Sequence, residues 1–169
     1  MKRFFLIAAA ATAIVGCKST YRWTSDVPQS MRTICVPTFR NESDTTELAT
    51  LASIQLLREF QREGTFKIAG HDDAAVEVQG VITSSTARSN GGYRGIQNRL
   101  FDNTATMTAE ISVVDRVNGR VLVDNKRYTA TTSFVSGQDD FLTAQRSASG
   151  RLAEDLAKQV VDDVLAVQW

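Results

Sequence analysis

The sequence is poor in the residues on which catalytic and disulfide-rich proteins depend. Its 169 residues include one histidine, two cysteines and two prolines. Nucleophilic and zinc-dependent sites usually need histidine or cysteine beside further ligands or a base. The single histidine, His71, lies in a Gly-His-Asp-Asp segment that is typical of a turn. We therefore expect no catalytic residue, no cofactor and no metal site.

Net charge and long apolar runs are also missing. The chain has 19 lysines and arginines and 19 aspartates and glutamates, so its formal net charge is zero. Such a chain has no overall positive field to attract nucleic acid. Beyond residue 17, no apolar run approaches the roughly 20 residues that a membrane-spanning helix needs. The composition argues against a nucleic-acid-binding protein and against a chain that spans a membrane.

What the sequence does contain is a three-part N-terminal segment. Lys2 and Arg3 precede a short apolar stretch that ends in Ile14-Val15-Gly16-Cys17. A small residue before a cysteine, after such a stretch, is typical of the site that bacterial lipoprotein signal peptidase cleaves. We predict a signal peptide over residues 1–16 and a lipidated Cys17 that carries diacylglycerol and a further acyl chain such as palmitate. The alternative is an ordinary secretory signal with an incidental cysteine.

Lipidation of Cys17 would leave the second cysteine without an intramolecular partner. Cys35 lies in the strand-like run Thr-Ile-Cys-Val, which favours a buried, inert thiol. Residues 17–32 are mostly polar and predict a lipidated tether. The remainder, residues 33–169, has the length of a single domain.

The first part of this domain predicts a strand followed by a helix. β-Branched residues favour a strand over residues 33–39. Apolar and small residues at spacings of three and four predict a helix over residues 45–63. Asp44 and Glu47 have the spacing of a capping box at the helix start. Gly64 can adopt the left-handed conformation that ends many helices.

The middle of the chain predicts strands joined by turns. Apolar and polar residues alternate over residues 100–117, which is typical of an antiparallel sheet with one covered face. The Asn-Gly pair that follows predicts a hairpin. The other expected elements are a strand at 66–68, a turn at 70–73, a strand at 75–88, a glycine-rich loop at 89–98, and a return strand at 121–132 with a bulge near Asn125.

The C-terminal part has helical periodicity and completes the predicted fold. Its apolar residues recur at a spacing of four, which predicts an amphipathic helix over residues 139–167. We expect an α+β two-layer sandwich, with two α-helices packed on one face of a largely antiparallel, mixed β-sheet of four to five strands. The expected core comprises Leu48, Leu56, Phe60, Ile82, Met107, Ile111, Val113, Leu152, Leu156 and Val160.

Basic residues gather around the glycine-rich loop and on the last strand. A solvated basic patch is the simplest interpretation. The alternative is a site for a phosphorylated lipid head group, because the planar guanidinium group matches phosphate. The threonine-rich face of the 100–117 strand could likewise face water or the wall of a larger partner. The candidate contact residues are Arg88, Tyr93, Arg94, Arg99, Thr106, Lys126 and Arg127.

Short motifs along the chain resemble those of one protein family. In chain order they are Cys17 with Tyr21-Arg22-Trp23, Val27-Pro28, the strand over residues 33–41, Phe60 to Gly64, Ala75 with Gly80 and Ile82, Val121-Leu122 after the Asn-Gly turn, and Leu152 to Leu156. Their order is similar to that of the LPS-assembly lipoprotein LptE family over essentially the whole mature chain. The sequence departs from the family at Lys18-Ser19-Thr20, which separate the cysteine from the aromatic stretch.

The resemblance implies a non-catalytic outer-membrane lipoprotein. Such a protein would face the periplasm and sit in the lumen of the β-barrel LptD, where it acts as a plug and assembly factor. Its role would be lipopolysaccharide transport to the outer leaflet, with a direct lipopolysaccharide contact as a further expectation. The main alternative is a curli- or secretion-type lipoprotein that forms an oligomeric ring or pore. A periplasmic enzyme is a third hypothesis, which the lack of a nucleophile–base pair disfavours.

Overall fold

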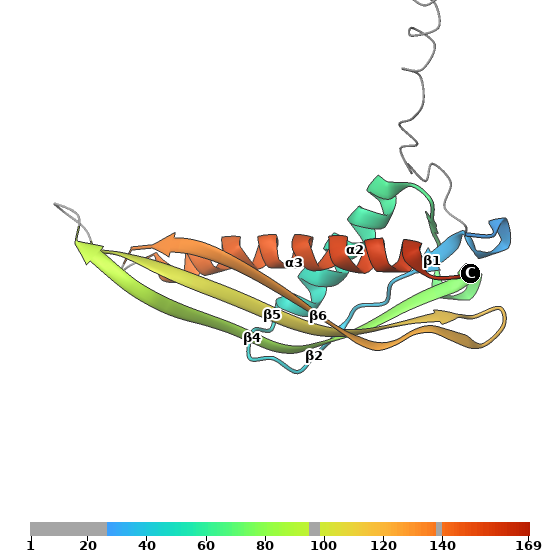
Figure 1. Cartoon of the computed structure of the whole chain (residues 1–169), viewed down its shortest axis with the longest axis horizontal. Coiled ribbons are helices and arrows are strands. Elements are labelled where there is room, and N and C mark those ends of the chain that lie inside the picture. The colour runs from blue at the N-terminus through green and yellow to red at the C-terminus, as the bar shows by residue number, and fades with distance from the viewer. Residues whose placement is uncertain (1–26, 95–98, 138–139) are drawn as a thin grey trace, which may run out of the picture.

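The structure is a computed structural model that describes residues 27–94, 99–137 and 140–169 (Figure 1). The predicted signal peptide, Cys17 and most of the predicted tether lie outside the described residues. The elements are the short 3₁₀ helix η1 (Gln29–Met31), β1 (Thr33–Cys35), β2 (Arg40–Asn41), α2 (Leu48–Glu63), β3 (Lys67–Ile68), the 3₁₀ helix η2 (His71–Asp73), β4 (Val76–Arg94), β5 (Arg99–Asp115), β6 (Arg120–Ser136) and α3 (Phe141–Ala166).

The described residues contain one mixed sheet of six strands. Its order is β3-β1-β4-β5-β6, and the two-residue strand β2 pairs with β4 beyond this path. The short strands β1, β2 and β3 pair in parallel, whereas β4, β5 and β6 form long antiparallel ladders. The sheet is therefore largely antiparallel, as predicted, with β2 as an additional strand.

The two helices lie on the same side of this sheet. The three long strands bow, and α3 runs along their concave side with α2 beside it (Figure 1). This confirms the two-layer α+β fold. All ten residues of the predicted core are at most 1% exposed. No helix among the described residues is both long enough and apolar enough to cross a membrane.

The expected strand over residues 33–39 is wrong in extent, because it divides into β1 and β2. Pro37 lies between them and has no backbone N–H to donate to a ladder. The N–H of Phe39 donates to Ser53 Oγ of α2 at 2.9 Å and not to a neighbouring strand. The chain then resumes pairing with β4, where Arg40 lies opposite Val81.

The predicted capping box is also wrong, because α2 begins at Leu48 and not at residue 45. Glu47 is the N-cap residue and makes no side-chain capping bond. Asn41 organises the preceding turn instead, donating to the carbonyl of Thr45 at 2.8 Å and accepting from the N–H of Ser43 at 3.0 Å. The predicted C-terminus is confirmed: Gly64 has φ 85° and its N–H donates to the carbonyl of Phe60.

The loop predicted over residues 89–98 is wrong for residues 89–94, which belong to a strand, and residues 95–98 lie outside the described residues. β4 continues to Arg94, and β5 begins at Arg99. Gly91 has φ 130°, which side-chain-bearing residues rarely adopt, and it accommodates a register shift after Ser89. Gly92 lies so close to the Phe101 ring that a Cβ would approach it within 2.8 Å. The glycines thus allow the ladder to bend and continue.

The remaining predicted strands and the C-terminal helix are confirmed with changes of length, and the turn predicted at 70–73 contains the short 3₁₀ helix η2. The Asn-Gly pair lies in the hairpin between β5 and β6, where Asp115 pairs with Arg120 and residues 116–119 form the loop. Asn125 has φ 39° and lies at a bulge in β6. β6 extends to Ser136, four residues beyond the predicted end. The helix α3 lies inside the predicted range, and Cys35 is buried and free.

Candidate functional site

No element among the described residues covers the sheet face opposite the helices (Figure 1). Side chains on this outer face alternate with core residues along each strand. Hydroxyl residues form rows across the three long strands. One row comprises Thr86, Thr106 and Thr131, and the next comprises Ser84, Thr108 and Thr129.

The contacts across this outer face are polar. The hydroxyl oxygens of Thr106 and Thr131 lie 3.3 Å apart, and Arg127 Nη2 donates to Glu110 Oε1 at 2.9 Å. Thr104, Thr106 and Thr108 are only partly exposed, since their neighbours cover them. Such a surface can form hydrogen bonds with water or with a polar wall. Val135, which lies opposite Asp102 on this face and is 50% exposed, adds an apolar side chain near one end.

Three of the predicted contact residues share this outer face. Arg88 pairs in register with Thr104 and has no hydrogen-bond or ion-pair partner among the described residues, whereas Arg127 is paired with Glu110. Thr106 lies between them on β5. Three more candidates lie at the far end of the β4–β5 ladder, where Tyr93 lies opposite Leu100 and Arg94 lies opposite Arg99.

Lys126 is separated from the others because it faces the helix layer. It forms an ion pair with Asp163 of α3, which also accepts a hydrogen bond from the Tyr128 hydroxyl at 2.8 Å. Burial alone would raise the pKa of Asp163, but the bonds from Lys126 and Tyr128 outweigh it and lower that pKa. Burial and the neighbouring carboxylate raise the pKa of Tyr128 far above its usual value. Lys126 therefore fastens α3 to the sheet.

The outer edge of β6 is partly closed by α3. β6 is the last strand of the sheet, so its outward carbonyl groups lack a strand partner. Arg151 Nη2 donates to the carbonyl of Ser133 at 3.2 Å, and Gln159 Nε2 donates to that of Thr129 at 3.3 Å. An edge occupied in this way is a poor template for a further strand.

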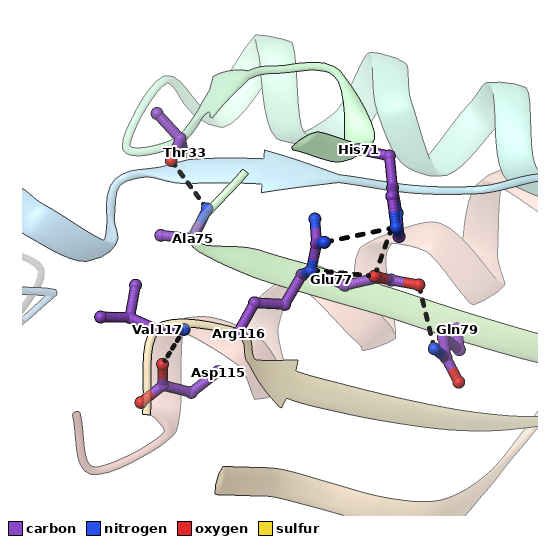
Figure 2. Close-up of polar contacts among 8 residues, drawn as sticks. All are labelled: Thr33, His71, Ala75, Glu77, Gln79, Asp115, Arg116 and Val117. Carbon is purple, nitrogen blue, oxygen red and sulfur yellow. Dashed lines mark hydrogen bonds and ion pairs between the residues drawn. The ribbon is translucent and has the colours of Figure 1, made fainter. Parts of the chain in front are cut away.

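A second candidate site lies where β1 and β4 pair, and it combines the single histidine with a cysteine and a carboxylate. Cys35 pairs in register with Glu77, and His71 of η2 lies above them. Glu77 Oε2 is 3.3 Å from His71 Nδ1 and 3.4 Å from Arg116 Nε, while its Oε1 accepts a bond from Gln79 at 2.9 Å (Figure 2).

The protonation pattern of this cluster follows from its donors. Arg116 Nη2 lies 3.3 Å from His71 Nε2, and arginine can only donate, so Nε2 accepts. Nδ1 of His71 then carries the proton that faces Glu77. Burial, with the Glu77 charge, raises the pKa of the Cys35 thiol. A protonated thiol is a poor nucleophile, which argues against a cysteine–histidine catalytic pair here.

Sequence reasoning missed this cluster. The residues around His71 are typical of a turn, and no local motif marks either Glu77 or Arg116. The three residues Cys35, His71 and Glu77 come together only because β1 and β4 pair in parallel. Parallel pairing between strands so far apart in the chain has no local sequence signal.

Comparison with known proteins identifies a family and a fold. The LptE family model, described as lipopolysaccharide-assembly, matches residues 31–166. Among solved structures, the chain is similar to protein CT253 of Chlamydia trachomatis, with 12% identity, a TM-score of 0.51, and coverage of 79% of this chain and 95% of that one.

Two further structures have a similar level of likeness. A neuraminyllactose-binding hemagglutinin homolog from Helicobacter pylori has 8% identity and a TM-score of 0.51, covering 83% of this chain and 86% of that one. A minor lipoprotein from Acinetobacter baumannii has 18% identity and a TM-score of 0.43, covering 82% and 94%. The two structures with TM-scores of 0.51 show a shared fold and no more. No curated protein sequence matches the chain significantly.

Proposed function

Because the chain belongs to the LptE family of lipopolysaccharide-assembly proteins, we propose that it is lipid-anchored at Cys17 and occupies the lumen of the outer-membrane barrel LptD. In this position it assists barrel assembly and the delivery of lipopolysaccharide to the outer leaflet. LptE-family proteins are non-enzymatic outer-membrane lipoproteins, which agrees with the N-terminal sequence. Residues 1–16 are the signal peptide in this proposal, and residues 33–169 are the lumenal domain.

The observation that carries the proposal is the uncovered polar face of the sheet. The interior of an outer-membrane barrel is polar, in contrast to its lipid-facing exterior. Rows of threonine hydroxyls, with the Glu110–Arg127 pair beside them, can form many weak hydrogen bonds with such an interior. A face of this kind suits a plug that is held by numerous small contacts.

The edge of β6 favours a plug over the ring alternative. A ring built by strand addition requires an open edge, but Arg151 and Gln159 already bond to outward carbonyls of β6. The polar outer face also lacks the large apolar interface that a stable homo-oligomer usually has.

A direct contact with lipopolysaccharide is favoured by the far end of the β4–β5 hairpin. Arg94 lies opposite Arg99 in the ladder, so two basic residues occupy this end of the hairpin. The fork-shaped guanidinium group of arginine suits phosphate. Arg88, which has no partner among the described residues, lies farther along the same strand.

The proposed partnership is tested by purifying the tagged, full-length protein from outer membranes in mild detergent. We expect a complex with one large barrel protein of LptD type, with one copy of each chain. A ladder of self-oligomers without a barrel would contradict the proposal and support the ring. Cys17→Ala should abolish globomycin-sensitive processing; a variant that is still matured and membrane-bound would refute the lipid anchor.

The lipopolysaccharide contact is tested by reversing the hairpin charges. Combined Arg88→Glu, Arg94→Glu and Arg99→Glu substitutions should reduce binding of purified lipopolysaccharide at least about tenfold, because each new carboxylate repels phosphate. The matched control reverses three basic residues outside the hairpin: Arg58, Arg62 and Lys67. Equal loss in both triple variants would show a general charge effect and would refute a specific site.

A further inference from the structure

We propose that Cys35, His71 and Glu77 form a binding site for a zinc-class divalent cation. The three side chains come from β1, η2 and β4, and one potential ligand atom of each lies within 4.8 Å of the other two. This cluster is separate from the outer sheet face on which the proposed function depends.

The spacing of the three atoms is close to that of a coordination site. A cation at the centre of a triangle of that size would lie at most about 2.8 Å from each atom, and zinc ligands bind at about 2.0–2.3 Å. Shifts of under about 1 Å per side chain therefore complete the geometry. Cys35 and Glu77 are held by paired strands, whereas His71, on a short 3₁₀ helix, can make most of the adjustment.

The donor set selects the class of metal. A thiolate and an imidazole favour zinc and similar borderline-soft ions over magnesium or calcium, which prefer oxygen ligands. Three protein ligands leave a fourth position of the zinc tetrahedron for water or an outside ligand. The His71 side chain is 61% exposed, whereas that of Glu77 is 9% exposed, so the cation would enter from the His71 side.

In the structure, Arg116 provides the positive charge beside Glu77 that a bound metal ion would otherwise supply. Its guanidinium group contacts both Glu77 and His71, but its Nη1 is buried and has no hydrogen-bond partner among the described residues. Arg116 also borders a hollow of about 400 Å³ that Asp72 and Asp73 line. This hollow gives the guanidinium group a place to move, beside two carboxylates.

When the cation binds, it therefore replaces the guanidinium group of Arg116 as the positive charge beside Glu77. The metal forms bonds to Cys35 Sγ, a Glu77 oxygen and His71 Nδ1, and the proton that Nδ1 carried passes through solvent to Nε2, which Arg116 has left. The Cys35 thiol loses its proton to solvent, since a coordinating thiol is deprotonated. Arg116 turns toward Asp72 and Asp73. The result ties η2 to the β1–β4 pair, at the edge of the sheet where β1 and β3 have only three and two residues.

The test is titration of the purified full-length protein, in detergent, with Zn²⁺ and separately with Co²⁺. We expect one tight site and, with Co²⁺, the intense near-ultraviolet absorption that indicates thiolate ligation. His71→Ala should weaken Zn²⁺ affinity at least about tenfold, and Cys35→Ser should abolish the charge-transfer band. Because His71 is largely exposed, its replacement should leave the circular dichroism spectrum unchanged.

Three controls make the outcome decisive. Cys17→Ser should retain the cobalt band, which excludes the N-terminal cysteine as the ligand. Arg116→Ala should bind Zn²⁺ more tightly than the wild type, because the competing cation is gone. Zn²⁺ should raise the melting temperature of the wild type but not that of His71→Ala. Absence of a thiolate band, or equal Zn²⁺ affinity in the wild type and His71→Ala, would overturn the proposal.

Discussion

The two faces of β5 differ although they belong to the same strand. On the inner face Met107, Ala109 and Ile111 have no exposed surface, whereas on the outer face Thr106 and Thr108 are partly exposed. The helices α2 and α3 cover the inner face, and no element among the described residues covers the outer one. The described part of the chain therefore covers the inner face and leaves the outer face open to water or to another protein.

The inner face of the sheet therefore contributes mainly to folding stability, and the outer face mainly to partner binding. Apolar residues that pack against α3 supply most of the free energy of folding, because burial of apolar surface is the main favourable contribution. The hydroxyl rows of the outer face add little to that free energy. Substitutions on the inner face should therefore unfold the protein, and substitutions on the outer face should affect partner binding.

The largest effect is expected for Leu156→Ala, which removes a side chain of α3 that is fully buried against the sheet. The resulting cavity should lower the free energy of unfolding by about 2–5 kcal/mol. Leu142→Ala, on the same helix, is the matched control because Leu142 is 75% exposed. Urea denaturation followed by circular dichroism measures both. A loss below about 0.5 kcal/mol for Leu156→Ala would contradict the assigned core.

An intermediate effect is expected for Asp115→Ala, a buried polar residue at the end of β5. Asp115 Oδ1 accepts bonds from the N–H groups of Val117 and Asn118, both at 3.0 Å. Its loss leaves these loop groups unpaired and should cost about 1.5–3 kcal/mol in urea denaturation at pH 7. Asp162→Ala, an exposed position on α3, should cost under about 0.5 kcal/mol.

The same residue predicts a pH dependence. Burial alone would raise the pKa of Asp115, but its bonds from Asn118 and Val117 prevail and lower it. The folded pKa is then below the unfolded value of about 3.9, so this stabilisation is complete above that value. It is lost as the pH falls through the lower folded pKa. The stability difference between wild type and Asp115→Ala should shrink in acid; a constant difference would contradict this account.

The smallest effects on the free energy of unfolding are expected for exchanges between valine and threonine, which have nearly the same shape, at two positions of β5. Val113→Thr places a hydroxyl group in the apolar core and should cost about 1–3 kcal/mol. Thr108→Val makes the reverse change on the outer face and should alter the free energy of unfolding by under about 0.5 kcal/mol. Both are measured by urea denaturation. Similar costs at the two positions would show that the outer face is packed as tightly as the inner one.

Local periodicity in the sequence predicts both faces of β5. The alternation over residues 100–117 identifies Met107 and Ile111 as core residues. Apolar residues at every fourth position near the C-terminus identify Leu152 and Leu156 as core residues as well. These elements are long, so one pattern extends over several turns or pairs. Packing within this layer is therefore predictable from the sequence.

Features that depend on distant pairing are not predictable in this way. The glycine-rich segment predicts a loop, but pairing with β5 extends β4 through Gly91 and Gly92. The proximity of Cys35 to Glu77 requires parallel pairing of β1 and β4. In both cases tertiary contacts override a local preference. The start of α2 is different, because it depends on local hydrogen bonds of Asn41 that compete with the predicted cap.

The central claim, that the outer sheet face meets the wall of LptD, is tested most directly by photo-crosslinking in cells. A photoreactive residue at Thr106 or Thr129 should give adducts of the size of LptD that antibodies against the barrel detect. The control position is Asp155, which is exposed on α3. Strong barrel adducts from Thr106 and Thr129, with weaker ones from Asp155, are the predicted result. Self-crosslinked ladders, or barrel adducts from Asp155 alone, would contradict the account.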